Sequence, residues 1–158
     1  MDKKAKVLSQ AIVFQHVNLS YGKKSILNDV CCSIEKGSYT AIIGPSGAGK
    51  STLLQMIPAL ISPTDGSIYV DGMEVTDTSA DIASLRKKIG FIFQYPEQQL
   101  FAKNVYEDVV FGPRNVGISE VEAEKRAYEA IQFVGLPQDV YDLPMDKLSG
   151  GQKRRVAL

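Results

Sequence analysis

The stretch "GPSGAGKST" constrains the fold of this chain most strongly, because it has the spacing G-x-x-x-x-G-K-[ST] from Gly44 to Ser51. Glycines adopt the backbone conformations that let a loop wrap around an anion with its N–H groups pointing inward. Lys50 supplies a point charge for the β- and γ-phosphates of a nucleotide, and the Ser51 hydroxyl can join the shell of Mg²⁺. The motif therefore predicts a phosphate-binding loop.

The flanks of this loop support the same interpretation over a chance match of a glycine-rich turn. Residues 38–44 form a short apolar run, as a buried strand would, and residues 50–60 have leucines at helical spacing, with Pro58 at the expected helix end. A strand before the loop and a helix after it are the context that the motif requires. We predict that the nucleotide is bound by Gly44, Pro45, Ser46, Gly47, Ala48, Gly49, Lys50, Ser51 and Thr52.

Length and charge exclude several classes of protein. A chain of 158 residues, 44% of them hydrophobic, suits one domain with a real core. Eighteen basic residues balance eighteen acidic ones, so we expect no nucleic-acid partner. The first ten residues lack the apolar core of a secretory signal, and no apolar run approaches the roughly 20 residues that span a bilayer.

Strands and helices alternate early in the sequence, and a helical section follows. Strand-like runs occupy residues 11–20, 25–35, 38–44, 64–72 and 89–94, and helical patterns occupy 79–88 and 119–136. The second helical pattern opens with the capping pair Ser119 and Glu122 and closes at Gly135. We expect one buried face on that helix, formed by Val121, Ala127, Ile131 and Val134. The order predicts an α/β protein with a helical insertion.

The cysteines and the lone histidine are expected to be ordinary strand residues. Cys31 and Cys32 are neighbours, so on a strand they point to opposite faces and would not bond to each other. Reduced cysteines fit a cytosolic protein. His16 has no second metal ligand beside it in the sequence, so we expect no metal site there.

The sequence "LSGGQ" near the end of the chain adds a second motif, formed by Leu148, Ser149, Gly150, Gly151 and Gln152. In this order, with a helical section between them, the two motifs resemble the ATP-binding-cassette family of transport ATPases. The resemblance covers the whole chain and implies a P-loop NTPase core with an N-terminal antiparallel β subdomain and a helical subdomain. The first part would span about residues 11–94, and the second about residues 95–158.

The resemblance also implies roles for residues outside the loop. Tyr21 stands where the family has an aromatic that stacks on adenine, and Gln94 stands at its Q-loop, where a glutamine reaches Mg²⁺ and the attacking water. By this analogy Gln94 and Lys50 are catalytic, and Ser51 and Gln94 are the metal-binding pair. Without the resemblance, Tyr21 would be interpreted as an ordinary tyrosine in a turn, and a glutamine after a strand, such as Gln94, would indicate no function.

The second motif, Leu148 to Gln152, is the signature loop of this family. Its residue types also suit anion binding, because its serine and glycines stand just before an expected helix and offer a hydroxyl and backbone N–H groups. In the family, two ATPase domains face head to tail, and each signature loop contacts the γ-phosphate bound by its partner. The resemblance therefore implies a second ATPase subunit, identical or related. Residues 153–155 are basic, and we interpret them as a solvated helix face rather than a phosphate site.

Residues 94–119, "QYPEQQLFAKNVYEDVVFGPRNVGIS", narrow the resemblance to the ATPase subunits of energy-coupling-factor importers, which take up vitamins, cobalt or nickel. Tyr95 to Phe101 corresponds to the region that faces the membrane-embedded coupling subunit, although part of it must also pack into the domain. The implied place is peripheral, on the cytoplasmic face of the membrane. The alternatives are another import cassette, a nucleotide-binding module without hydrolysis, or a soluble cassette acting on ribosomes or DNA, which the neutral charge disfavours.

The family has further catalytic parts after the signature helix, namely a strand with a magnesium-binding aspartate and a catalytic glutamate, a D-loop and a switch histidine. The 158 residues contain no match to them. We therefore expect a chain that is incomplete at its C-terminus and hydrolyses ATP hardly at all. The absent strand would lie beside residues 41–44, so we also expect exposed apolar surface there.

Overall fold

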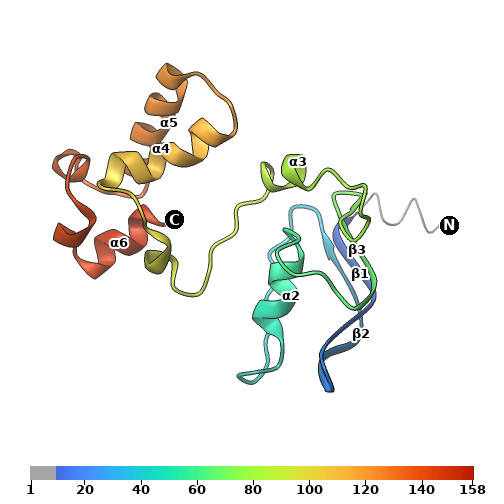
Figure 1. The fold of residues 1–158 in the computed structure, drawn as a ribbon. Coiled ribbons are helices and arrows are strands. Elements are labelled where there is room, and N and C mark those ends of the chain that lie inside the picture. The colour runs from blue at the N-terminus through green and yellow to red at the C-terminus, as the bar shows by residue number, and fades with distance from the viewer. Residues whose placement is uncertain (1–9) are drawn as a thin grey trace. The chain divides into compact units, whose positions relative to one another are not determined.

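The computed structural model describes residues 10–158, and the chain divides into two compact units (Figure 1). The first unit ends at Ile89, and the second comprises Gly90–Leu158. Each unit has its own buried apolar residues, so each is described by itself.

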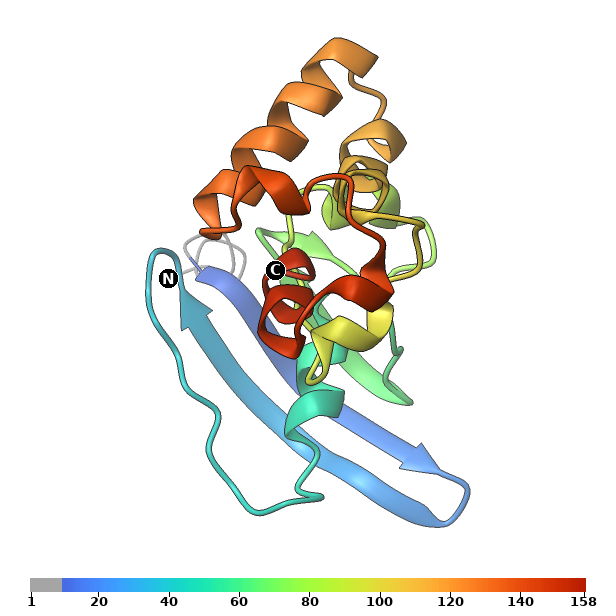
Figure 2. The same ribbon diagram turned by 90° about the vertical axis from the view of Figure 1, so that its left-hand side faces the viewer.

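The first unit is built on a four-stranded antiparallel sheet with the strand order β2-β1-β3-β4. Two long strands, β1 (Gln10–Tyr21) and β2 (Lys24–Glu35), form a hairpin that runs the length of this unit (Figure 2). Strand β3 (Asp65–Val70) pairs with β1, and the short β4 (Met73–Glu74) pairs with β3. The predicted N-terminal antiparallel β subdomain is thereby confirmed.

Helix α2 (Lys50–Met56) closes the core of the first unit against the sheet. Its buried side chains Leu53 and Met56 belong to the same apolar cluster as Phe14 and Ile68 of the strands. The helix ends two residues before Pro58, whose ring would clash with a further turn. A short α3 (Ile82–Arg86) follows the sheet and begins at Asp81, whose side chain accepts the N–H of Ser84 at 3.0 Å.

Two predicted strands are not formed. Residues 38–44 and 89–94 have no strand structure, because neither segment pairs with any of the four strands among the described residues. A strand needs a hydrogen-bonded neighbour to satisfy its backbone groups. The side chains of Tyr39 and Ile43 are consequently fully or almost fully exposed, so the apolar surface expected before the phosphate loop is present.

The second unit is helical. Its α-helices are α4 (Val105–Asn115), α5 (Glu120–Phe133) and α6 (Gly150–Val156), and its 3₁₀ turns are η1 (Pro96–Gln99), η2 (Gln138–Val140) and η3 (Met145–Lys147). Helices α4 and α5 pack on each other through Val110, Ala123 and Ala127. A second cluster contains Val105, Ile131, Leu136, Val140, Leu148 and Val156. Among the described residues, no helix has the length and apolar character needed to cross a membrane.

The limits of α5 agree with the sequence, but one predicted core residue is wrong. Ser119 accepts the N–H of Glu122 at the helix start, and Gly135 has a left-handed φ of +70° just after its end. Val121 is 80% exposed, because the buried stripe of α5 follows Ala123, Ala127 and Ile131 at spacings of four residues and leaves Val121 outside it.

The hairpin has a bulge at His16, where the pairing of β1 slips against both of its neighbours. His16 itself has a φ of +51°, and Gly66 of β3, with a φ of +93°, lies opposite the bulge. A Cβ atom on Gly66 would lie 2.3 Å from the His16 carbonyl oxygen. Only glycine therefore fits at position 66, both for its backbone angle and for the close approach of β1.

We predict that Gly66→Ala lowers the free energy of unfolding by about 2–4 kcal/mol, since it combines a strained backbone angle with a clash against main-chain atoms. Urea denaturation measures the change. The matched control is Gly22→Ala in the hairpin turn, where φ is +60° but a Cβ would meet nothing within 4 Å. Equal losses in the two variants would contradict the role given to the close approach.

Candidate functional site

The predicted phosphate loop connects residues 38–44 to helix α2 and uses glycine where the backbone demands it. Gly47 and Gly49 have φ values of +80° and +88°, in the region that disfavours other residues. A Cβ on Gly49 would lie 2.8 Å from the Leu27 side chain and 3.3 Å from the Ile26 carbonyl oxygen of β2. The end of the loop is therefore seated directly on the hairpin.

Lys50 holds its charge over the loop. Its Nζ donates hydrogen bonds to the carbonyl oxygens of Gly44 and Pro45, both at 2.8 Å. The same turn is closed by the Ala48 N–H, which donates to the Pro45 oxygen at 3.3 Å. The ammonium group thus lies against the main chain at the start of the loop.

The remainder of the loop is open to a ligand. Residues 44–48 are exposed, as is Ser51 in the first turn of α2, while Thr52 is half-buried. Tyr21 is 59% exposed at the end of β1. Two residues earlier in β1, Leu19 pairs with Leu27, which is the residue that Gly49 approaches. Tyr21 therefore lies on the same hairpin that the end of the phosphate loop contacts.

Gln94 and the segment after it belong to the second unit. Gln94 is exposed in an irregular stretch just before η1. The following segment is anchored by the buried Pro96, but it exposes the rings of Tyr95 and Phe101, at 56% and 65%. Phe101 also stacks edge-on against Phe111 of α4, with 4.8 Å between the ring centroids. The segment has both of the expected parts, one packed and one exposed.

The signature residues form the start of α6. The Ser149 Oγ accepts the N–H of Gln152 at 3.2 Å, and the Gln152 side chain accepts the N–H of Ser149 at 2.8 Å, which makes a complete capping box. Leu148 anchors this end in the core. Gly150 and Gly151 are exposed, and a Cβ on either would meet nothing within 4 Å, so no packing within the described residues requires glycine there.

One cluster of side chains was not predicted from the sequence. His16 Nδ1 lies 2.7 Å from Asp29 Oδ1 and 3.5 Å from Cys31 Sγ. The expectation that no second metal ligand lies near His16 is wrong, because the fold brings Asp29 and Cys31 beside it. No local sequence pattern indicates the cluster, because these side chains come together only through the bulge in β1 and the pairing of β1 with β2. Cys31 and Cys32 are both free thiols, as expected.

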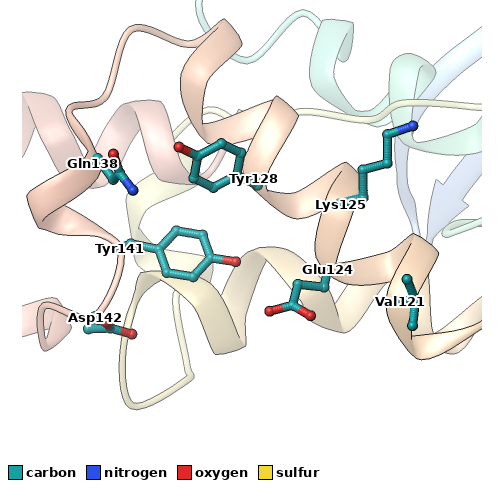
Figure 3. Close-up of a pocket in the computed structure, with 7 residues that line it drawn as sticks. All are labelled: Val121, Glu124, Lys125, Tyr128, Gln138, Tyr141 and Asp142. Atoms are coloured by element: carbon teal, nitrogen blue, oxygen red, sulfur yellow. The ribbon is translucent and has the colours of Figure 1, made fainter.

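A cavity of about 450 Å³ lies between α5 and η2 and contains none of the predicted site residues (Figure 3). It is lined by Val121, Glu124, Lys125, Tyr128, Gln138, Tyr141 and Asp142. Tyr141 extends toward Glu124, and its ring stacks edge-on against Tyr128, with 5.9 Å between the centroids. Partial burial, with the nearby Tyr106 and Glu124, raises the pKa of the Tyr141 hydroxyl to about 12, so it stays neutral at physiological pH.

Comparison with known proteins identifies what this geometry resembles. The sequence profile described as "ABC transporter" matches residues 27–158. The energy-coupling factor transporter ATP-binding protein EcfA2 of Clostridium perfringens is 48% identical over 138 residues, which are 86% of this chain and 48% of that protein. The protein of the same name from Lactococcus lactis is 47% identical over 154 residues, 93% of this chain and 54% of that protein. The chain thus spans about half the length of the curated relatives it matches.

Two solved structures have the same fold. CbiO1 of Clostridium perfringens, described as part of the ABC transporter complex CbiONQ, has a TM-score of 0.79 and 36% identity and is matched over 94% of this chain and 59% of its own. An ATP-binding cassette solved as a dimer in a post-hydrolysis state, bound to ADP and phosphate, has a TM-score of 0.81 and 33% identity and is matched over 92% of this chain and 66% of its own. The predicted ABC ATPase-like fold is confirmed.

Proposed function

The chain belongs to the ABC transporter family, and from this premise we propose that it is the nucleotide-binding part of an ATPase subunit that powers an energy-coupling-factor importer. The observation that carries the proposal is the phosphate loop, with left-handed glycines at 47 and 49 and the Lys50 ammonium held over its carbonyl oxygens. This arrangement suits ATP better than a smaller anion, because Tyr21 on the same hairpin offers an exposed ring for adenine to stack on.

The proposed ligand is ATP with Mg²⁺. The loop N–H groups and Lys50 would bind the β- and γ-phosphates, and Tyr21 would hold the base. Ser51 and Gln94 are exposed and offer oxygen atoms, the ligand type that Mg²⁺ prefers. When bound, the ion would neutralise part of the phosphate charge. Gln94 would also orient the attacking water during hydrolysis, which we propose for the whole protein.

The signature loop is proposed to act on a second ATPase subunit, identical or related. Glycine in a helix is about 1 kcal/mol less favourable than alanine, and nothing around Gly150 and Gly151 in the described chain explains two of them in succession. A ligand that approaches the backbone from outside explains both. The γ-phosphate held by the partner is the proposed ligand, and the solved dimeric cassette with ADP and phosphate supports such an assembly.

We propose that the segment Tyr95–Phe101 docks onto the membrane-embedded coupling subunit. The exposed rings of Tyr95 and Phe101 would insert into an apolar groove, while Pro96 keeps the segment anchored to its own unit. The names of the relatives, which are ATP-binding proteins of energy-coupling factor transporters, support this partner. The protein would then lie peripherally on the cytoplasmic face of the membrane.

We predict that Lys50→Ala weakens MgATP binding by roughly 10- to 100-fold, because it removes a charge-assisted contact to the phosphates. Isothermal titration calorimetry of the full chain measures the dissociation constant. Lys125→Ala, on the exposed face of α5, serves as the control for loss of a lysine charge and should leave binding unchanged. An unaltered affinity in Lys50→Ala would refute the phosphate-loop assignment.

Ser149→Arg is expected to leave MgATP binding intact and to block ATP-dependent association of two ATPase subunits, since the bulky side chain would occupy the space above Gly150 and Gly151. Sedimentation with and without ATP measures the association. Ser119→Arg is the matched control, because it removes the N-cap of another helix in the same unit. If both variants associate as the unmodified protein does, the signature loop does not face the partner's nucleotide.

A further inference from the structure

We propose that His16, Asp29 and Cys31 form a binding site for one divalent ion of the zinc class on the β1–β2 hairpin. The imidazole nitrogen, the carboxylate oxygen and the thiol sulfur all lie within 4.8 Å of one another. All three residues are exposed, so an ion can reach them from solvent. None of the three residues is among those proposed above to bind the nucleotide or Mg²⁺.

Two of these three residues have backbone conformations that are energetically unfavourable. His16 and Asp29 have φ values of +51° and +48°, and such conformations cost about 1–3 kcal/mol each in a residue other than glycine. The Asn18 side chain connects both: its Nδ2 donates to the His16 carbonyl oxygen, and its Oδ1 accepts the Asp29 N–H, each at 2.8 Å. The short distances between the ligand atoms therefore depend on the bulge in β1, against which Gly66 of β3 packs closely.

The donor set matches the chemistry of zinc. Imidazole nitrogen, thiolate sulfur and carboxylate oxygen are the three side-chain ligand types of Zn²⁺ in proteins. The backbone N–H of His16 donates to the Cys31 sulfur, with the nitrogen 3.2 Å away, and a hydrogen bond to that sulfur stabilises the thiolate that a metal requires. With three protein ligands, the fourth position of a tetrahedral ion is left for water or a further ligand.

One of the two distances from His16 Nδ1 already suits a tetrahedral ion, and the other must lengthen. Ordinary Zn–N and Zn–S bonds in a tetrahedron place the two ligand atoms about 3.5 Å apart, and His16 Nδ1 and Cys31 Sγ are 3.5 Å apart. The corresponding N···O separation is about 3.4 Å, whereas His16 Nδ1 and Asp29 Oδ1 are 2.7 Å apart as a hydrogen-bonded pair. Rotation of the exposed Asp29 carboxylate would open that pair and admit the ion.

The geometry favours a metal site over an activated cysteine nucleophile. In a nucleophile–base–acid relay, the thiol and the carboxylate contact opposite nitrogens of the imidazole ring. Here Asp29 and Cys31 both approach Nδ1 of His16. The three atoms lie within 4.8 Å of one another and therefore not along a line, as the ligands of a single ion must.

The test is a titration of the full chain, without nucleotide, with Zn²⁺ by calorimetry and with Co²⁺ by absorption spectroscopy. We expect one equivalent to bind, and Co²⁺ to give the sulfur-to-metal charge-transfer band that reports a thiolate ligand. Cys31→Ser should abolish that band and weaken Zn²⁺ binding by more than about 100-fold, beyond the effect of losing an outer hydrogen-bond partner. His16→Asn should weaken it similarly, since asparagine keeps the left-handed backbone.

Cys32→Ser is the matched control, because it removes the neighbouring exposed thiol, which lies outside the cluster. It should bind Zn²⁺ as the unmodified chain does, and Zn²⁺ should raise its melting temperature while leaving that of Cys31→Ser unchanged. Metal-free melting temperatures of all variants separate loss of a ligand from loss of the fold. The proposal is overturned if the unmodified chain shows no saturable binding, if Cys32→Ser loses the ion as Cys31→Ser does, or if His16→Asn binds normally.

Discussion

The approach of Gly49 to Ile26 and Leu27 is the constraint on which the first unit depends. It fixes the end of the phosphate loop on the β1–β2 hairpin and determines where α2 begins, so that Leu53 and Met56 reach the core on the sheet. Strand β1 of this hairpin ends at Tyr21. The close contact of Gly49 with β2 thus positions both the core of the unit and the proposed nucleotide site.

In the second unit, each of the three α-helices begins at a residue whose side chain caps it. Asn104, Ser119 and Ser149 each accept a backbone N–H at the beginning of α4, α5 and α6. The cap of α6 differs from the other two because a pair of exposed glycines succeeds Ser149, and nothing in the described chain fills the space beside them. Local stability and the proposed contact with a partner's nucleotide are therefore provided by adjacent residues, and the two roles can be separated by mutation.

Local sequence signals predicted the parts of the structure that depend on neighbouring residues. The strands at residues 11–20 and 25–35 and the limits of α2 and α5 follow from propensity and capping. The predicted strands at residues 38–44 and 89–94 are absent, because a strand depends on partners elsewhere in the chain. The cluster at His16 could not be predicted either, since it arises from a slip in strand register that no local pattern specifies.

The central claim is that the loop at Gly44–Thr52, seated on the hairpin, is where this chain binds nucleotide. Backbone amide shifts in the NMR spectrum, recorded as a non-hydrolysable MgATP analogue is added, test it most directly. The account predicts that the largest changes fall on the amides of residues 46–52, with a change in the Tyr21 ring signals from base stacking. Changes confined to the cavity around Tyr128 and Tyr141, with the loop amides unaffected, would contradict it.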